Sequence, residues 1–309
     1  MPTDRESARL EVRKTYKLYI GGSFPRSESG RTYVVTDAKG RFVANVSRAS
    51  RKDARDAVVA ARKAFSGWSA RTPYNRGQVV YRIAEVLEGR RAQFTDEVQA
   101  GEGVSKAVAA DTVSAAVDRL VWYAGWADKV AQVLGSTNPV SGPYFDFSTP
   151  EPTGVVAVVA PQASSLLGLV SVVAPVITTG NTCVLVTSFA RPVPAVTLAE
   201  VMATSDVPGG VVNVLTGDPA EVAPWLASHD DVNAIDLTGV TDPQLATELE
   251  VAAAGNLKRV LRATGVPVAS EGAAPSAQPG GEPDWSVDPG TARMTAFLET
   301  KTVWHPIGL

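Results

Sequence analysis

From Gly154 onward the chain alternates short, continuous apolar runs with helical segments. The β-rich runs lie at 154–160, 182–186, 211–215 and 233–237, with a weaker one at 258–262. Helical patterns separate them at 165–179, 192–205, 218–228 and 242–254. A strand that is apolar at every position is buried on both faces, and strands alternating with helices form right-handed crossovers. The pattern therefore predicts an α/β fold, with a Rossmann-like, mostly parallel sheet and helices on both faces.

Three helices are predicted before this region. The first begins at Ser50, where Asp53 completes a capping box. The second begins at Pro73 directly after Thr72, because proline suits the first turn of a helix. The third is rich in alanine and covers about 105–130.

Composition excludes several classes of protein. The chain has 309 residues, 45% of them apolar, a net charge of -3, one cysteine and two histidines. The charge gives no general attraction to nucleic acid or to an anionic membrane, and so few cysteines and histidines predict neither a disulfide framework nor a metal site. We also expect no secretory signal in the charged N-terminus and no membrane span. The expected location is cytoplasmic.

A segment rich in proline, alanine and glycine follows the last predicted strand, at 266–293, and its composition is typical of an extended linker. After it, 297–304 is rich in β-forming residues. A lone strand is not stable, so we expect it to pair with another strand-like stretch, at 142–148. Residues 1–15 are predicted to be flexible.

Several of these segments, in this order, resemble the aldehyde dehydrogenase superfamily. The matching motifs include LYIGG at 18–22, WYAGWADK at 122–129, PTGVV at 152–156, PGGVVN at 208–213 and ETKTVW at 299–304. The resemblance covers roughly 17–265 and 295–305. It implies a cofactor-type Rossmann-like domain at 16–130 and 150–265, and oligomerisation strands at 131–149 and 294–309. It also implies that the linker at 266–293 replaces the family's catalytic domain, which makes the chain pseudoenzyme-like.

The same resemblance implies that the family's catalytic groups are missing, so no catalytic residue is predicted. The family oxidises aldehydes with a cysteine thiolate, and the only cysteine here, Cys183, matches a core strand position instead. Ala163 stands where the family has an asparagine that stabilises the oxyanion, while the neighbouring Gln162 is one position away. Ala263 stands where the family has a glutamate base.

Cofactor binding is predicted to be absent or weak. The family binds the adenosine ribose with a lysine and a glutamate, which Val186 and Phe189 replace, and the bulky Phe189 could fill the ribose space. Thr238, Gly239 and Thr241 remain from the family's turn that faces the pyrophosphate, so a weak NAD(P) site is the most that the resemblance implies.

In the family, the strands that correspond to residues 131–149 form a hairpin, and those that correspond to 294–309 form a closing strand. Both add to the catalytic sheet of a neighbouring subunit. The predicted partner is therefore a full-length aldehyde dehydrogenase, which this chain would stabilise or regulate as a non-catalytic subunit in a hetero-oligomer. One alternative is an NAD(P)-dependent dehydrogenase whose active site is completed by another chain. Another is that the strands pack only within this chain. The candidate interface residues are aromatic or β-forming: Tyr144, Phe145, Phe147, Thr302, Val303 and Trp304.

Overall fold

A five-stranded parallel sheet forms the centre of the computed structural model, which describes residues 13–262 and 282–308. Its strand order is β10-β9-β6-β7-β8. The strands are β6 (Val155–Val159), β7 (Thr182–Val186), β8 (Val212–Leu215), β9 (Ala234–Asp236) and β10 (Arg259–Leu261). All five predicted strands are thus confirmed, in an α/β fold.

Both faces of this sheet are buried, as its apolar strands predicted. In β6, Val155, Ala157 and Val159 face one hydrophobic cluster, whereas Val156 and Val158 face the other. Successive side chains of a strand point to opposite faces, so each strand contributes to both clusters. Only a run of consecutive apolar residues supplies apolar side chains to both clusters.

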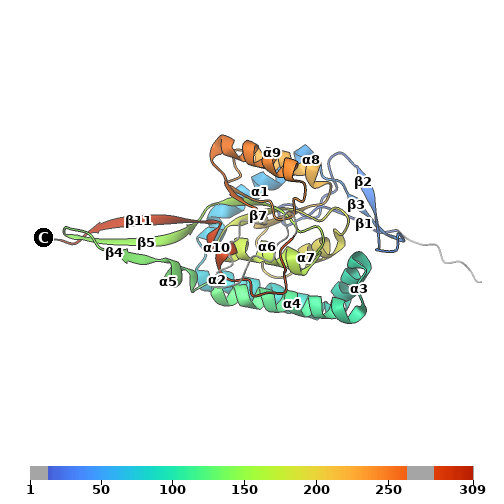
Figure 1. The fold of residues 1–309 in the computed structure, drawn as a ribbon, viewed down its shortest axis with the longest axis horizontal. Coiled ribbons are helices and arrows are strands. Elements are labelled where there is room, and N and C mark those ends of the chain that lie inside the picture. Colours follow the sequence, from blue (N-terminus) through green and yellow to red (C-terminus); the bar gives the residue numbers. More distant parts are fainter. Residues whose placement is uncertain (1–12, 263–281, 309) are drawn as a thin grey trace, which may run out of the picture.

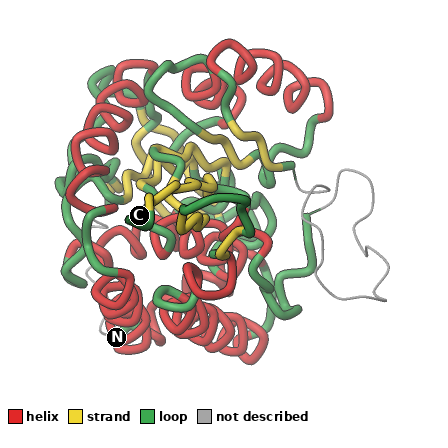
Figure 2. The backbone as a smooth tube through the Cα atoms, turned by 90° about the vertical axis from the view of Figure 1, so that its left-hand side faces the viewer, coloured by secondary structure: helices red, strands yellow, loops and turns green. Residues whose placement is uncertain are grey.

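Helices cover the two faces (Figures 1 and 2). One face packs against α1 (Arg51–Ser69), α8 (Pro219–Ala227) and α9 (Pro243–Ala253), which a short 3-10 turn at Ala254–Asn256 follows. The other face packs against α6 (Leu167–Thr178) and α7 (Val193–Ala203). Outside these lie α2 (Pro73–Gly89), α3 (Arg91–Glu102) and α4 (Lys106–Trp126).

The predicted helix starts are confirmed by their capping contacts. The Ser50 side chain accepts a hydrogen bond from the backbone of Asp53, whose carboxylate accepts one in return from the Ser50 N–H. Thr72 caps α2 and accepts from the Asn75 N–H. These contacts satisfy amide groups that have no partner within the first turn of a helix.

A second, small sheet precedes α1 and was not predicted. It has the order β1-β3-β2, from Thr15–Tyr16, Phe42–Ser47 and Thr32–Thr36. Thr15 already pairs with Asn45, so the predicted flexible terminus at 1–15 is wrong at its last residue, while residues 1–12 lie outside the described part. The turn at 37–40, which ends in Gly40 at φ +78°, was the available sequence signal for this hairpin.

A third sheet projects from the domain as an arm (Figure 1). It follows α5 (Val130–Leu134) and has the order β11-β5-β4, from Leu298–Pro306, Tyr144–Pro152 and Ser136–Asn138. The predicted pairing between the closing strand and 142–148 is confirmed, because β11 and β5 are antiparallel from Leu298 opposite Pro152 to Pro306 opposite Tyr144. We call these three strands the arm.

The predicted linker at 266–293 is wrong in its described part. Between 282 and 297 the chain packs along α6 and α4 and forms a short helix, α10 (Ala292–Thr295), before it enters β11 (Figure 1). Trp285, Met294 and Phe297 are buried in the same cluster as α6. We call residues 282–297 the strap. Residues 263–281 of the predicted linker lie outside the described residues.

Candidate functional site

The candidate site lies where the loops after β6, β7 and β9 meet. In an open parallel sheet, ligands bind beyond the carboxyl ends of strands at the point where strand order reverses. Here β6 lies between β7 on one side and β9 on the other, so the reversal is between β6 and β9. The predicted residues Ala163, Thr238 and Gly239 all follow these two strands.

The loops after β6 and β9 are in direct contact. The Gly239 N–H donates to the Val159 carbonyl at 3.1 Å. A Cβ atom built on Gly239 would lie 1.8 Å from the Ala160 carbonyl oxygen, so only glycine allows this approach. Gly239 therefore joins two strands of the sheet, and its N–H is already bonded within the protein.

Thr238 belongs to a buried ion pair. Arg293, from the strap, contacts the Asp236 carboxylate at 2.8 Å and donates to the Thr238 hydroxyl at 3.0 Å. The Asp236 carboxylate also accepts from the Thr238 N–H at 2.9 Å. The side chains of Arg293 and Asp236 are only 6% and 0% exposed. Sequence reasoning missed both residues, and Arg293 fell within the predicted linker.

The third residue of the predicted pyrophosphate turn, Thr241, is exposed at the start of α9. The helix terminus beside it is already capped, because Asp242 accepts from the Gln244 N–H at 2.9 Å. Pro243 has no N–H to offer. A phosphate group at this helix terminus would therefore meet the Asp242 carboxylate.

The two predicted ribose positions point in different directions. Val186 is fully buried in the cluster beneath α1 and α8. Phe189 is 37% exposed and stacks on Tyr33 of β2, with ring centroids 4.7 Å apart. The Phe189 side chain thus packs against the small sheet β1-β3-β2. The sequence did not predict this sheet.

The loop after β6 directs a row of backbone N–H groups at acidic side chains. The N–H groups of Ala163 and Ser164 donate to the Glu282 carboxylate, at 2.7 and 3.3 Å, and that of Gln162 makes a third bond to it. Ala163 itself is exposed and offers only its backbone. The Gln162 amide, which sequence reasoning placed away from the oxyanion position, bonds to the Ala160 carbonyl and the Phe189 N–H.

The single cysteine has no catalytic surroundings. Cys183 is fully buried in β7, and burial raises the pKa of its thiol far above the ordinary value. A reactive cysteine needs the opposite, a lowered pKa and access to solvent. Ala263, which stands at the family's base position, lies outside the described residues. Among the described residues, no group of three or more histidine, cysteine or acidic side chains is placed to hold a metal ion.

Comparison with known proteins agrees with this architecture. The sequence profile described as "Aldehyde dehydrogenase family" matches residues 24–267. The chain belongs to the aldehyde dehydrogenase family. It is 34% identical to retinal dehydrogenase 2 of Gallus gallus over 257 residues, which are 81% of this chain and 48% of that protein. It is 32% identical to cytosolic aldehyde dehydrogenase 1 of Elephantulus edwardii, over 79% of this chain and 49% of that protein.

Two solved structures share the fold. An NAD+ complex of aldehyde dehydrogenase from Bacillus cereus aligns with a TM-score of 0.76 and 27% identity, covering 81% of this chain and 51% of that one. HpcC from Thermus thermophilus aligns with the same TM-score of 0.76, also at 27% identity, covering 81% and 48%. The chain therefore spans about half the length of the family members that it matches.

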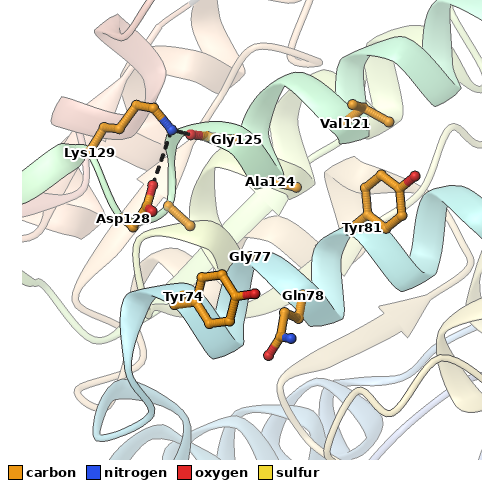
Figure 3. Close-up of a pocket in the computed structure, with 10 residues that line it drawn as sticks. Tyr74, Gly77, Gln78, Tyr81, Val121, Ala124, Gly125, Asp128 and Lys129 are labelled. Atoms are coloured by element: carbon orange, nitrogen blue, oxygen red, sulfur yellow. Dashed lines mark hydrogen bonds and ion pairs between the residues drawn. The ribbon is translucent and has the colours of Figure 1, made fainter.

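One further concave surface lies apart from these loops. A groove of about 460 Å³ runs between α2 and α4, with Tyr74 and Tyr81 on one side and Val121 on the other (Figure 3). Its only carboxylate, Asp128, contacts the Lys129 ammonium at 3.2 Å. The groove offers shape and aromatic surface rather than groups for acid–base chemistry.

No helix in the described ranges is long and apolar enough to cross a membrane.

Proposed function

We propose that this chain is a non-catalytic subunit that assembles with a full-length, active aldehyde dehydrogenase and stabilises or regulates it. The observation that carries the proposal is the arm. Its strand β11 lies at the sheet edge, and the aromatic side chains of Tyr144, Phe145 and Trp304 are 43%, 47% and 59% exposed. A long edge strand with exposed aromatic residues is a template for pairing with another chain.

The two faces of the arm differ. On one face, Asn138 donates to Asp146 and Ser148, and Ser148 shares a hydrogen bond with Thr302, so the polar groups satisfy one another. The rings of Tyr144 and Trp304, whose centroids are 5.7 Å apart, lie on this same face. On the other face, Val303 lies opposite Phe147, whose ring is 5.6 Å from that of Phe145. Both faces of the arm therefore present aromatic rings, and these are the side chains that would gain most from burial against a partner.

The proposed partner is chosen by what two copies of this chain would need in order to exchange arms. Two copies that exchange arms would each need a receiving catalytic sheet, and in this chain β11 begins at Leu298, a short stretch after β10 ends at Leu261. A full-length family member supplies such a sheet. Loss of chemistry in this chain is supported by buried Cys183 and by Ala163, which offers only backbone to the site.

The residues at the strand-order reversal between β6 and β9 do not fit a dinucleotide well. The N–H of Gly239 and the side chain of Thr238 are bonded within the protein, and Asp242 occupies the terminus of α9. We therefore propose that the chain alone has no firm NAD(P) site. A ligand at one hundred times its dissociation constant stabilises a fold by about 2.7 kcal/mol, so added NAD+ should leave the unfolding temperature of the isolated chain unchanged. A clear rise would favour the alternative dehydrogenase whose site another chain completes.

The assembly is tested by affinity purification of the tagged chain from its native host, with a Phe145→Ser/Trp304→Ser double variant beside the wild type. The wild type should retain a full-length aldehyde dehydrogenase and its activity, and the double variant should lose both. Trp225→Ser is the matched control, since Trp225 is 41% exposed but lies on α8, away from the arm. Recovery of the wild type without any such enzyme, or equal recovery with the double variant, would overturn the proposal.

A further inference from the structure

The strap brings a carboxylate to the loop between β6 and α6. Glu282 is about 120 residues away along the chain, yet its two oxygens accept from the backbone N–H groups of Gln162, Ala163 and Ser164. All three donors precede α6, which begins at Leu167. Consecutive N–H groups that converge in this way form a concave cradle for an anion.

Glu282 is held in the cradle by packed structure. Trp285, three residues later, is buried against Gly168, and a Cβ atom at Gly168 would lie 2.9 Å from the indole nitrogen. Arg119 of α4 then donates to the carbonyls of Trp285 and Val287, at 2.8 and 2.9 Å. The strap is thus fixed at Trp285 and Val287, which keeps the backbone of Glu282 close to the cradle.

One cation and a second carboxylate lie beside the cradle. The Arg191 guanidinium bonds to the carbonyls of Gln162 and Ala163 on the same loop. The next N–H, that of Ser165, is already taken by Glu102 at 2.7 Å. Hydrogen bonds from backbone N–H groups to a carboxylate are charge-assisted and stronger than neutral ones.

We infer that Glu282 is a built-in occupant that closes this cradle to outside anions. The contact closes the cradle from within the chain, because the donors that could hold a phosphate or carboxylate group are satisfied by Glu282. Removal of the carboxylate would leave three N–H groups beside Arg191 without their acceptor. The cradle would then accept a small anion from solution.

The test compares the isolated wild-type chain with Glu282→Ala, using amide hydrogen exchange at 162–164 and titration with inorganic pyrophosphate. We expect exchange at these amides to be about tenfold faster or more in the variant, since each loses a hydrogen bond to a charged acceptor. Pyrophosphate should slow exchange again in the variant and leave the wild type unchanged. Glu299→Ala is the control, because it removes an equal charge from an exposed position on β11.

Two results would overturn the inference. One is equal pyrophosphate binding by wild type and variant, which would show that Glu282 does not block the cradle. The other is a folded variant that exchanges faster but binds no pyrophosphate. Should Glu282→Ala fail to fold, Glu282→Ser keeps a polar side chain that is too short to reach the loop, and the same two readouts apply. No partner subunit takes part, so failure here leaves the proposed assembly untouched.

Discussion

Loss of the Arg293 side chain should destabilise this fold strongly. It pairs with Asp236, a carboxylate that is 0% exposed, and it bonds to Thr238 and lies 5.0 Å from the Trp285 ring. Arg293→Ala would leave the Asp236 charge buried with only Thr238 as partner. Breaking a buried pair by removing one member costs about 3–5 kcal/mol. The free energy of unfolding should fall by that amount.

The comparison is an exposed ion pair in the same protein. Lys301 and Glu151 are 2.9 Å apart, but their side chains are 57% and 47% exposed. Surface pairs contribute about 0–1 kcal/mol, so Lys301→Ala should barely shift the urea midpoint followed by far-ultraviolet circular dichroism. Asp236→Ala and the double variant complete a cycle, whose coupling energy should be about 1–3 kcal/mol. If Arg293→Ala shifts the midpoint no more than Lys301→Ala, the strap is not anchored as described.

Two further outcomes follow from buried groups. Because burial raises the pKa of the Cys183 thiol, iodoacetamide should label it only after unfolding; labelling of the native chain at pH 8 would contradict its burial. Burial also raises the pKa of Glu97, whose carboxylate accepts from Gln93 and Thr197. Between the ordinary pKa of about 4.3 and the raised one, the native state binds more protons than the unfolded state, so stability falls as pH rises. Glu97→Gln should remove that fall in urea titrations, and parallel pH profiles for variant and wild type would refute the assignment.

The candidate site shows how far sequence reasoning reached. It placed Ala163, Thr238 and Gly239 at strand ends of one sheet, and the structure brings them to one strand-order reversal. It did not find Glu282 or Arg293, because a proline- and glycine-rich composition predicts an extended linker whether or not a few of its side chains are buried. A tryptophan at 285 within that segment was the one sign of a buried anchor.

The sequence by itself determined the alternation of strands and helices, the helix caps and the pairing of the closing strand. These features depend on local periodicity, on residues three apart, or on a strand with one available partner. Only the tertiary structure decided that the strap covers α6, that Asp236 meets Arg293 across 57 residues, and that Glu282 fills the cradle at 162–164. Such contacts join segments that are distant along the chain, and buried charges choose their partners only once packing has brought those segments together.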